Sequence, residues 1–598
     1  MNADEQNDTA VGGYFSIPDG LGFPVTRRIF TPEKFSEEQK MAAETAKKFI
    51  EKEIAPKMAE IEEQKGDYGL TVKLLKKVAE LGFLGTDVPE EYGGAGCDFT
   101  TAMCVSEVFG TGGSWAVSWA AHGGIGVHPL LFFGTDAQKK KYLTKLVSGE
   151  WIGAFGATEP EAGTDLYGAK TKATPSADGK FYILNGSKTF ISNSGFAGLF
   201  TIFAKVDGDP KKSACFLVER GSQGFTIGKE ESKMGISGSS TCPLNLVDVQ
   251  VPAENLLGEI GKGIHIIFNT LNLGRLKLGA MTLGSGKRII TEAVQYAAGR
   301  KQFGLPISQF GMIKEKFANM VVGVWMTESA VYRTTGLVDE KFKGTDFKNF
   351  TKTLETLREY EIECSILKVA GSEMFWHITD ENLQIHGGYG YIKDYPAERY
   401  LRDARINRIF EGTNEINRLT AILNLLDRAG KGRLPLAKAG AALAAQLEES
   451  SGEEISDEPL ALQTELVDNI KKMFFVAGGR VLEKFPAREK ITGEQEILRR
   501  LSDMLILIYL AESGLLRAKQ TGGEIPEAIV KLYIQNAALE AEKLAKEVLA
   551  FLEEGDMLKS YLGRLKRLGR TLANNLINPV SLQRKIADKL IEKNKYFL

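Results

Sequence analysis

Glu411 stands in a short segment, residues 408–418, whose residue types could carry out acid–base chemistry. We expect a helix to stop here, because Gly412 is a poor helix former and Thr413 can cap the amphipathic run that follows. A carboxylate at such a break, preceded by two apolar residues, can project into an apolar cavity. Desolvation there would raise its pKa from about 4.3 towards the range of a general base. A surface loop glutamate is the commoner alternative, and the segment alone does not exclude it.

Two turn-rich segments could hold a cofactor. Residues 155–165 offer threonine hydroxyls and open backbone amides, and residues 185–194 place Phe190 beside serine hydroxyls. Such groups suit a planar heterocycle with a pyrophosphate tail, although a plain β-turn is the alternative for each segment alone. No GxGxxG motif follows a strand, so a Rossmann dinucleotide fold is not indicated. The five histidines lack metal-ligand spacing, so we expect no metal.

Composition restricts the class of protein. The 598 residues are too many for one hydrophobic core, and the 43% apolar and 25% charged content is ordinary for a soluble protein. A formal net charge of −2 gives no electrostatic case for nucleic acid as a partner. Five scattered cysteines without a CxxC pair indicate a reducing compartment. We see no signal or transit peptide and no membrane span, and therefore expect a cytoplasmic protein.

Periodicity divides the chain into helical and β parts. Helical patterns such as 37–55 and 72–81 give way to short β-branched or aromatic runs at 181–185, 199–206 and 215–218, and long helical patterns then return. The predicted fold is mostly α with an inserted antiparallel β domain. The expected units are an N-terminal arm (1–34), a helical domain (35–150), a middle β domain (151–260), a four-helix-bundle domain with the base (261–430), a linker (431–460) and a C-terminal helical domain (461–598).

At this point the chain resembles the acyl-CoA dehydrogenase family. The resemblance covers about residues 35–427, and the C-terminal extension is similar to that of the very-long-chain branch. It rests on many separate motifs in the right order, namely Ala157–Pro160, Ala162–Asp165, Asn185–Lys188, Ile191–Asn193, Lys233–Gly235, Leu271–Arg275, Arg300–Gly304, Gln384–Gly390 and Phe410–Thr413.

The resemblance implies an FAD enzyme with residues in defined roles. Glu411 would remove the pro-R α-proton of an acyl-CoA thioester while N5 of FAD accepts the β-hydride. The flavin would contact a first group of residues: Phe155, Ala157, Thr158, Gly163, Thr164, Phe190, Ile191 and Ser192. In this group Phe190 and Ser192 replace the family's usual tryptophan and threonine. The adenosine diphosphate half would be held across a subunit boundary by a second group: Arg300, Gln302, Phe303, Phe310, Gln384, Ile385, Gly387, Gly388, Thr413 and Glu415.

The substrate site implied by the resemblance includes Thr164, Arg275 and Gly412. Some branches of the family carry the base immediately before the arginine that corresponds to Arg275. Here that neighbour is Gly274, which cannot titrate, so the proton must go to Glu411. Arg275 would lie near the pantetheine and phosphates of the substrate, although a structural ion-pair partner is the alternative.

The acyl chain length is indicated only by one helix. Ala116 and Ala120 stand at i,i+4 in the helical pattern 113–124, which puts two small side chains on one face. In the family this helix forms the floor of the acyl tunnel, so small residues favour medium to long chains. Close helix packing over the alanines is an equally good explanation.

Three functions remain open. The first is a dehydrogenase of fatty acid β-oxidation that passes electrons to an electron-transferring flavoprotein. The second is an acyl-CoA oxidase, which usually reads Glu-Gly-Asp where this chain has Thr413. The third is a flavin-bearing scaffold protein, against which an intact Glu411 argues. The C-terminal extension implies a homodimer, and its mixed charges favour a helical dimer-capping domain over peripheral membrane contact.

Overall fold

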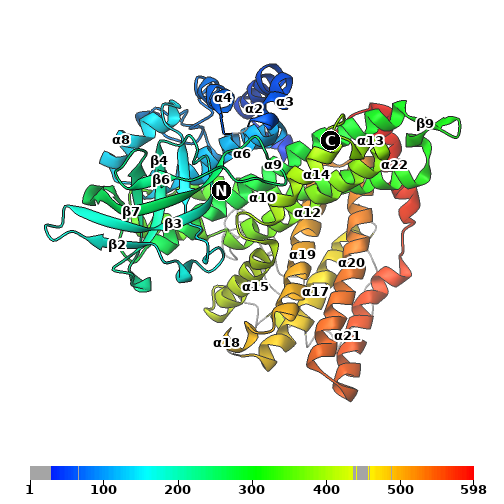
Figure 1. Ribbon diagram of the computed structural model, residues 1–598. Coiled ribbons are helices and arrows are strands. Elements are labelled where there is room, and N and C mark those ends of the chain that lie inside the picture. Colours follow the sequence, from blue (N-terminus) through cyan, green and yellow to red (C-terminus); the bar gives the residue numbers. More distant parts are fainter. Residues whose placement is uncertain are drawn as a thin grey trace.

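The computed structural model describes residues 29–64, 66–434, 439–440, 443, 456, 458–486 and 488–598. Most of the expected N-terminal arm and of the expected linker therefore lie outside the described residues. Figure 1 shows a β sheet at one side of the molecule, a layer of long helices across its middle and a further group of helices beneath that layer. The predicted fold class, mostly α with an inserted β domain, is confirmed.

The N-terminal helices begin at well-formed caps. Ser36 forms a capping box with Gln39 at the start of α2, and Thr135 does the same with Gln138 at the start of α8. A π-helical turn follows α2 and another follows α6, where the sequence had predicted continuous α-helix. The helices are α2 (Glu37–Phe49), α3 (Met58–Glu63), α4 (Gly69–Ala79), α5 (Phe99–Phe109), α6 (Gly113–Ala121), α7 (His128–Phe133) and α8 (Asp136–Val147).

The middle β unit is one twisted sheet of eight strands in the order β6-β7-β3-β2-β4-β5-β8, with β1 paired to β4. Most pairs are antiparallel as expected, but β1 and β2 both run parallel to β4. The sheet is bent because β3 carries register shifts at Leu184/Gly186 and at Lys188/Ile191. The strands are β1 (Gly153–Gly156), β2 (Lys172–Pro175), β3 (Phe181–Ser192), β4 (Leu199–Val206), β5 (Ser213–Glu219), β6 (Phe225–Ile227), β7 (Thr241–Pro252) and β8 (Leu256–Leu257).

The long central helices form a bundle, in which α9 and α12 pack together along most of their length. Their apolar residues belong to the largest hydrophobic cluster of the described chain. A short hairpin of β9 (Lys301–Gln302) and β10 (Leu305–Pro306) joins α9 to α10. The helices are α9 (Gly263–Gly299), α10 (Gly311–Lys343), α11 (Phe350–Arg358), α12 (Glu361–His386), α13 (Gly388–Tyr391), α14 (Ala397–Arg405) and α15 (Asn414–Gly430).

The C-terminal helices dock on the bundle through buried polar contacts as well as apolar ones. Arg333 of α10 bonds Glu512 of α19 at 2.8 Å, and Arg418 of α15 bonds Asp503 at 2.6 Å. The last helix, α22, returns to α10, so the chain end lies beside the bundle (Figure 1). The helices are α17 (Ala461–Lys484), α18 (Arg488–Ile491), α19 (Gln495–Thr521), α20 (Glu524–Leu552), α21 (Gly555–Asn574) and α22 (Pro579–Lys593).

Candidate active site

Glu411 lies in a tight loop between α14 and α15. The loop follows a 3-10 turn, Ile406–Arg408, and ends at Thr413, whose side chain caps α15 by accepting a hydrogen bond from Ile416 N at 3.3 Å. Glu411 has φ +59° and Gly412 has φ +81°, so two successive residues are left-handed. A left-handed non-glycine residue costs about 1 kcal/mol or more, and such strain is commonly stored at functional sites.

Two side chains hold this strained loop in place. Asn417 Nδ2 shares its hydrogens among the carbonyl oxygens of Glu411, Gly412 and Thr413, at 3.3, 2.8 and 3.0 Å. Arg275 Nε donates to the Glu411 carbonyl from the opposite side, at 3.1 Å. The backbone N–H of Glu411 has no acceptor among the described residues and remains available as a donor. The loop therefore fixes one carboxylate and one free backbone donor at the same position.

The carboxylate of Glu411 is in a dry, electrically unusual place. Its Oε2 atom is buried and has no hydrogen-bond partner in the described chain, although the residue as a whole keeps some accessible surface. Burial raises the pKa of Glu411 to about 7, against the opposing charges of Arg275, Lys368 and Lys277. A carboxylate with a pKa near neutral pH is suited to general base catalysis.

Gly274 makes room for this carboxylate. A Cβ atom at position 274 would stand 3.0 Å from Glu411 Oε2 and 3.2 Å from Oε1. The sequence had singled out Gly274 because glycine cannot titrate. The structure adds that its missing side chain leaves space for Glu411.

A cavity of about 360 Å³ opens beside the loop. Its lining includes Phe190 and Ser192 at the end of β3, and Ile409 and Phe410, which directly precede Glu411. The cavity is within the size range of ligand pockets in proteins. Its lining is Phe190, Ser192, Glu231, Ser232, Lys233, Met234, Gly235, Ile236, Thr241, Arg402, Arg405, Ile406, Ile409 and Phe410.

The bulge in β3 aims Phe190 at this cavity. Phe190 has φ +59° within the register shift, and 65% of its surface is exposed. The half-buried Ser192 lines the cavity, and no hydrogen bond joins its hydroxyl to another described residue. Ile191 between them is buried and can offer only its backbone. An exposed ring, a serine hydroxyl and the apolar side chains of Ile409 and Phe410 match what a planar heterocycle such as isoalloxazine requires.

The second predicted flavin segment is fastened to the first. Thr189 N donates to the Thr158 carbonyl at 3.0 Å, and Lys188 Nζ of β3 donates to Glu159 Oε1 at 2.7 Å. Both members of this ion pair are buried. Phe155 and Ala157 are buried in the sheet, whereas Gly163 and Thr164 are exposed and Thr158 is partly so. The structure therefore brings residues 155–164 next to residues 190–192.

The predicted nucleotide-binding residues fall into two groups. Thr413 and Glu415 lie beside Glu411. The others gather at the β9–β10 hairpin and the end of α12, where the Arg300 guanidinium lies 5.6 Å from the centre of the Tyr389 ring. In Figure 1 this hairpin projects at the opposite end of the molecule from the β sheet. Within one chain these residues, Arg300, Gln302, Phe303, Phe310, Gln384, Ile385, Gly387 and Gly388, do not reach the 360 Å³ cavity.

Phe303 at the hairpin tip is the most conspicuous of these residues. It is 95% exposed and has φ +53°, and its ring meets that of Phe310 edge-on, with centroids 6.2 Å apart. Gln384, Gly387 and Gly388 are also exposed, while Ile385 belongs to the core. An exposed aromatic residue in a strained backbone conformation is difficult to explain in an isolated chain.

Arg275 has a different setting from the one expected. It is only 4% exposed, and its Nη1 donates to Asn272 Oδ1 at 3.1 Å and Ser365 Oγ at 3.4 Å. These contacts, with the bond to the Glu411 carbonyl, keep the guanidinium inside the bundle behind the loop. The arginine therefore holds the loop of Glu411 through its backbone carbonyl. The sequence had offered a substrate contact or a structural ion-pair partner, and the contacts found here are hydrogen bonds to neutral groups.

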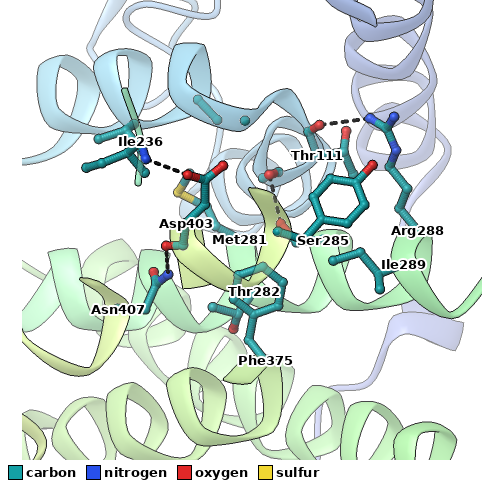
Figure 2. Close-up of a pocket in the computed structure, with 15 residues that line it drawn as sticks. Thr111, Ile236, Met281, Thr282, Ser285, Arg288, Ile289, Phe375, Asp403 and Asn407 are labelled. Carbon is teal, nitrogen blue, oxygen red and sulfur yellow. Dashed lines mark hydrogen bonds between the residues drawn. The ribbon is translucent and has the colours of Figure 1, made fainter. Parts of the chain in front are cut away.

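Ala116 lines a second, smaller cavity of about 90 Å³, which lies between α6, α9 and α14. Figure 2 shows Asp403 accepting from Ile236 N and Arg288 donating to the Thr111 carbonyl at its edges. Met281, Ile289 and Phe375 supply its apolar surface. Ala120 does not line this cavity, and Trp115 and Trp119 are buried in the aromatic core of the N-terminal domain.

Several functional positions were not found from the sequence. Lys368 lies near Glu411, donates to Asn414 Oδ1 at 2.8 Å, and has its pKa lowered to about 7 by burial. Lys277, Asn417 and the Lys188–Glu159 pair were also missed. A lysine within an otherwise apolar helical run is the signal that could have indicated Lys277 and Lys368, because buried lysines are rare unless they have a role.

Across the described ranges, no group of three or more His, Cys, Asp or Glu side chains is placed to hold a metal ion. None of the described helices combines the length and apolar character needed to cross a membrane.

Comparison with known proteins gives one consistent result. Family models match residues 36–150 (acyl-CoA dehydrogenase, N-terminal domain), 154–249 (middle domain), 261–426 (C-terminal domain) and 469–567 (a further C-terminal domain). A probable acyl-CoA dehydrogenase of Bacillus subtilis is 43% identical over 98% of this chain and 99% of its own length. The human mitochondrial very long-chain specific acyl-CoA dehydrogenase is 37% identical over 82% of this chain and 77% of its own. An acyl-CoA dehydrogenase from Bacillus anthracis, solved in complex with FAD, is 43% identical and covers 98% of this chain and 100% of its own, with a TM-score of 0.92.

Proposed function

We propose, since the chain belongs to the acyl-CoA dehydrogenase family and is an FAD-dependent oxidoreductase acting on acyl-CoA, that it oxidises medium- to long-chain fatty acyl-CoA to the trans-2-enoyl-CoA, with Glu411 as the base. One observation carries the assignment of the base. Glu411 has a buried, unpartnered carboxylate oxygen, its pKa is raised to about 7, and it directly follows Ile409 and Phe410, which line the 360 Å³ cavity. A solvated carboxylate is too weak a base for the α-proton of a thioester, and burial corrects this.

The residues around Glu411 are arranged to support proton abstraction. Arg275 and Asn417 bond the backbone carbonyl of Glu411, which fixes the point from which its side chain extends. The free N–H of Glu411 can donate to a thioester carbonyl oxygen as negative charge develops there. FAD, when bound, supplies the acceptor for the hydride that leaves the β-carbon. The α-proton goes to Glu411, which becomes neutral.

The flavin is assigned to the 360 Å³ cavity between Phe190 and Phe410. Ser192 offers a free hydroxyl, and residues 155–164 complete the cradle through their backbone amides. The hairpin that carries several of the remaining predicted nucleotide-binding residues lies at the opposite end of the molecule from the β sheet (Figure 1), and Phe303 in this hairpin is 95% exposed. Both facts support a homodimer in which each hairpin completes the FAD site of the other subunit.

The finer points of the function rest on the same resemblance. Ala116 at the wall of the smaller cavity supports a long acyl site, because a small side chain there leaves space for methylene groups. The Glu-Gly-Thr sequence at Glu411 favours an electron-transferring flavoprotein over oxygen as the acceptor. We place the reaction in cytoplasmic fatty acid β-oxidation.

One anaerobic titration tests the proposal. Purified holoenzyme is mixed with octanoyl-, dodecanoyl- and palmitoyl-CoA, the loss of flavin absorbance is followed, and air is then admitted. We expect rapid bleaching, slow reoxidation in air, and retention of FAD but almost no bleaching in Glu411→Gln. Bleaching of Glu411→Gln at the native rate would refute the base, fast reoxidation in air would indicate an oxidase, and no bleaching by any of the three would indicate a scaffold.

A further inference from the structure

Lys277 is a buried lysine without a hydrogen-bonded acidic partner among the described residues, and it lies about one helical turn after Gly274, which faces Glu411. Lys277 is 6% exposed, and its only hydrogen bond to a described residue goes to the Gly123 carbonyl, at 3.0 Å. An ammonium group has three N–H donors, so two of them have no acceptor among the described residues. A buried charge is normally paired, because removing it from water carries a large free-energy penalty. Lys277 is therefore an exception that calls for a functional explanation.

The placement of Lys277 follows from α9. Residues three apart share a helix face, so Lys277 extends from the same face as Gly274, where a Cβ would meet the Glu411 carboxylate. On its far side Lys277 lies against the π-helical turn His122–Gly126, and a Cβ at Gly124 would stand 3.8 Å from its Nζ. Its Nζ is 5.3 Å from the centre of the Trp119 ring, within the range of a cation–π interaction.

Several titratable groups surround Lys277 and Glu411. Asp87, after α4, attracts the ammonium but is bonded to His128 of α7 at 2.9 Å. His122 is kept neutral by burial and by the charge of Lys277, which lower its pKa. Arg275 and Lys368 are the other cations that act on Glu411. Glu361 acts on Arg275, and Glu373 and Glu415 act on Lys368.

Lys277 differs from the other two cations in how it can act. Arg275 bonds the carbonyl of Glu411, and Lys368 bonds Asn414 at the start of α15, so both also hold the loop in shape. Lys277 bonds neither the loop nor α15. Its influence on Glu411 is therefore electrostatic, and it can be removed without loosening the loop.

We propose that Lys277 is a positioning residue for proton abstraction, whose buried positive charge increases the fraction of Glu411 that is ionised near neutral pH. The proposal rests on Glu411 being the base. Lys277 keeps all its hydrogens throughout, because the α-proton passes from the substrate carbon to Glu411 alone. Burial lowers the pKa of Lys277, and the charges of Asp87 and Glu411 oppose this effect. The positive charge of Lys277 adds to the larger effects of Arg275 and Lys368, which also lower the pKa of Glu411.

The test is the pH dependence of anaerobic flavin reduction in the holoenzyme, measured by stopped flow from about pH 5.5 to 9.5. The substrate is whichever of octanoyl-, dodecanoyl- and palmitoyl-CoA reduces the wild type fastest. Lys277→Gln retains a donor for the Gly123 carbonyl and removes the charge. Its acid limb should move to higher pH by about one unit, the size expected from a neighbouring charge in a protein interior. Above that limb the two rates should converge, and Lys277→Arg should restore the wild-type profile.

Three further measurements make the result decisive. Lys139→Met removes another lysine that is only 7% exposed, on α8 away from the site, and should leave the profile unchanged. Lys277→Met is the second variant if Lys277→Gln retains no FAD, and it must show the same displacement. An acid limb that coincides with the wild type in either FAD-loaded variant would overturn the proposal. Native-rate reduction by Glu411→Gln would instead show that the base assignment had failed.

Discussion

Replacing Gly274 by alanine should separate stability from activity. Gly274 lies inside α9, where alanine is preferred over glycine by about 1 kcal/mol, so the helix itself should become more stable. The new methyl group, however, would stand 3.0 Å from Glu411 Oε2 and 3.2 Å from its Cδ. These distances are shorter than the carbon separation of about 3.5–4.0 Å at which contact is most favourable. The carboxylate must therefore retreat by a few tenths of an ångström.

That retreat sets the expected size of the effect. A displacement of about 1 Å at a catalytic group costs roughly a hundredfold in rate, so a few tenths should cost several-fold to about tenfold. The loop cannot absorb the shift by backbone rotation, because Arg275 and Asn417 hold the Glu411 carbonyl from two sides. We expect Gly274→Ala to reduce flavin several-fold more slowly than wild type, with a free energy of unfolding that is unchanged or higher.

The assay pairs stopped-flow flavin reduction under saturating acyl-CoA with thermal unfolding of the same preparations. Gly563→Ala on α21 is the matched control, since a Cβ there meets nothing within 4 Å. It should raise the stability by about 1 kcal/mol and leave the rate unchanged. A native rate in Gly274→Ala, with FAD retained, would show that the Glu411 carboxylate does not occupy this space in the working enzyme.

Three other predictions follow from the same site. Glu411 has its pKa raised from 4.5 to about 7 in the folded protein, so the folded state loses stability as the pH rises through this interval. In denaturant melts, the free energy of unfolding of Glu411→Gln should match that of wild type at about pH 4 and exceed it by up to about 2–3 kcal/mol at about pH 8. Lys188→Met should lower the free energy of unfolding by roughly 3–5 kcal/mol in the same melts and lose much of its FAD by flavin absorbance, because Glu159 is left buried and unpaired. The control Lys180→Met, at an exposed lysine, should change neither. Phe303→Ser should have a free energy of unfolding within about 0.5 kcal/mol of wild type, yet it should lose FAD on gel filtration. Full retention of FAD would contradict the intersubunit site.

The sequence indicated the elements well where the pattern was regular and poorly where it was interrupted. The strand 199–206 was predicted at the bounds that the structure shows, since an uninterrupted buried run is easily read. The neighbouring β3 was predicted to stop at residue 185 but continues to Ser192, because two bulges break its alternation. The helical pattern 113–124 ends as α-helix at Ala121 and continues as a π-helical turn. Local propensity does not report a register change that is decided by packing partners.

Within the site, too, local features could be predicted from the sequence and long-range contacts could not. Glu411 and the cap at Thr413 could be identified because loop-forming residues stand next to each other in the sequence. The groups that tune Glu411 come from positions far along the chain: Gly274, Arg275 and Lys277 on α9, and Lys368 on α12. The contacts of Arg275 with Ser365 and the Glu411 carbonyl could not be predicted for this reason, since they exist only after α9 and α12 have packed together. Such contacts depend on the bundle and not on any local motif.

The bundle also explains why the base can be left so poorly satisfied. An orphaned carboxylate oxygen, a left-handed glutamate and a lysine without an acidic partner would each destabilise a small protein by about 1–3 kcal/mol. Here α9 and α12 are anchored elsewhere by extensive apolar contact and by buried ion pairs such as Arg333–Glu512. Relaxing the site would require these long helices to shift, which the packed core opposes. The free energy held at Glu411 is thus maintained by residues that never touch the substrate, which is why Gly274→Ala and Lys277→Gln can alter the base without unfolding the chain.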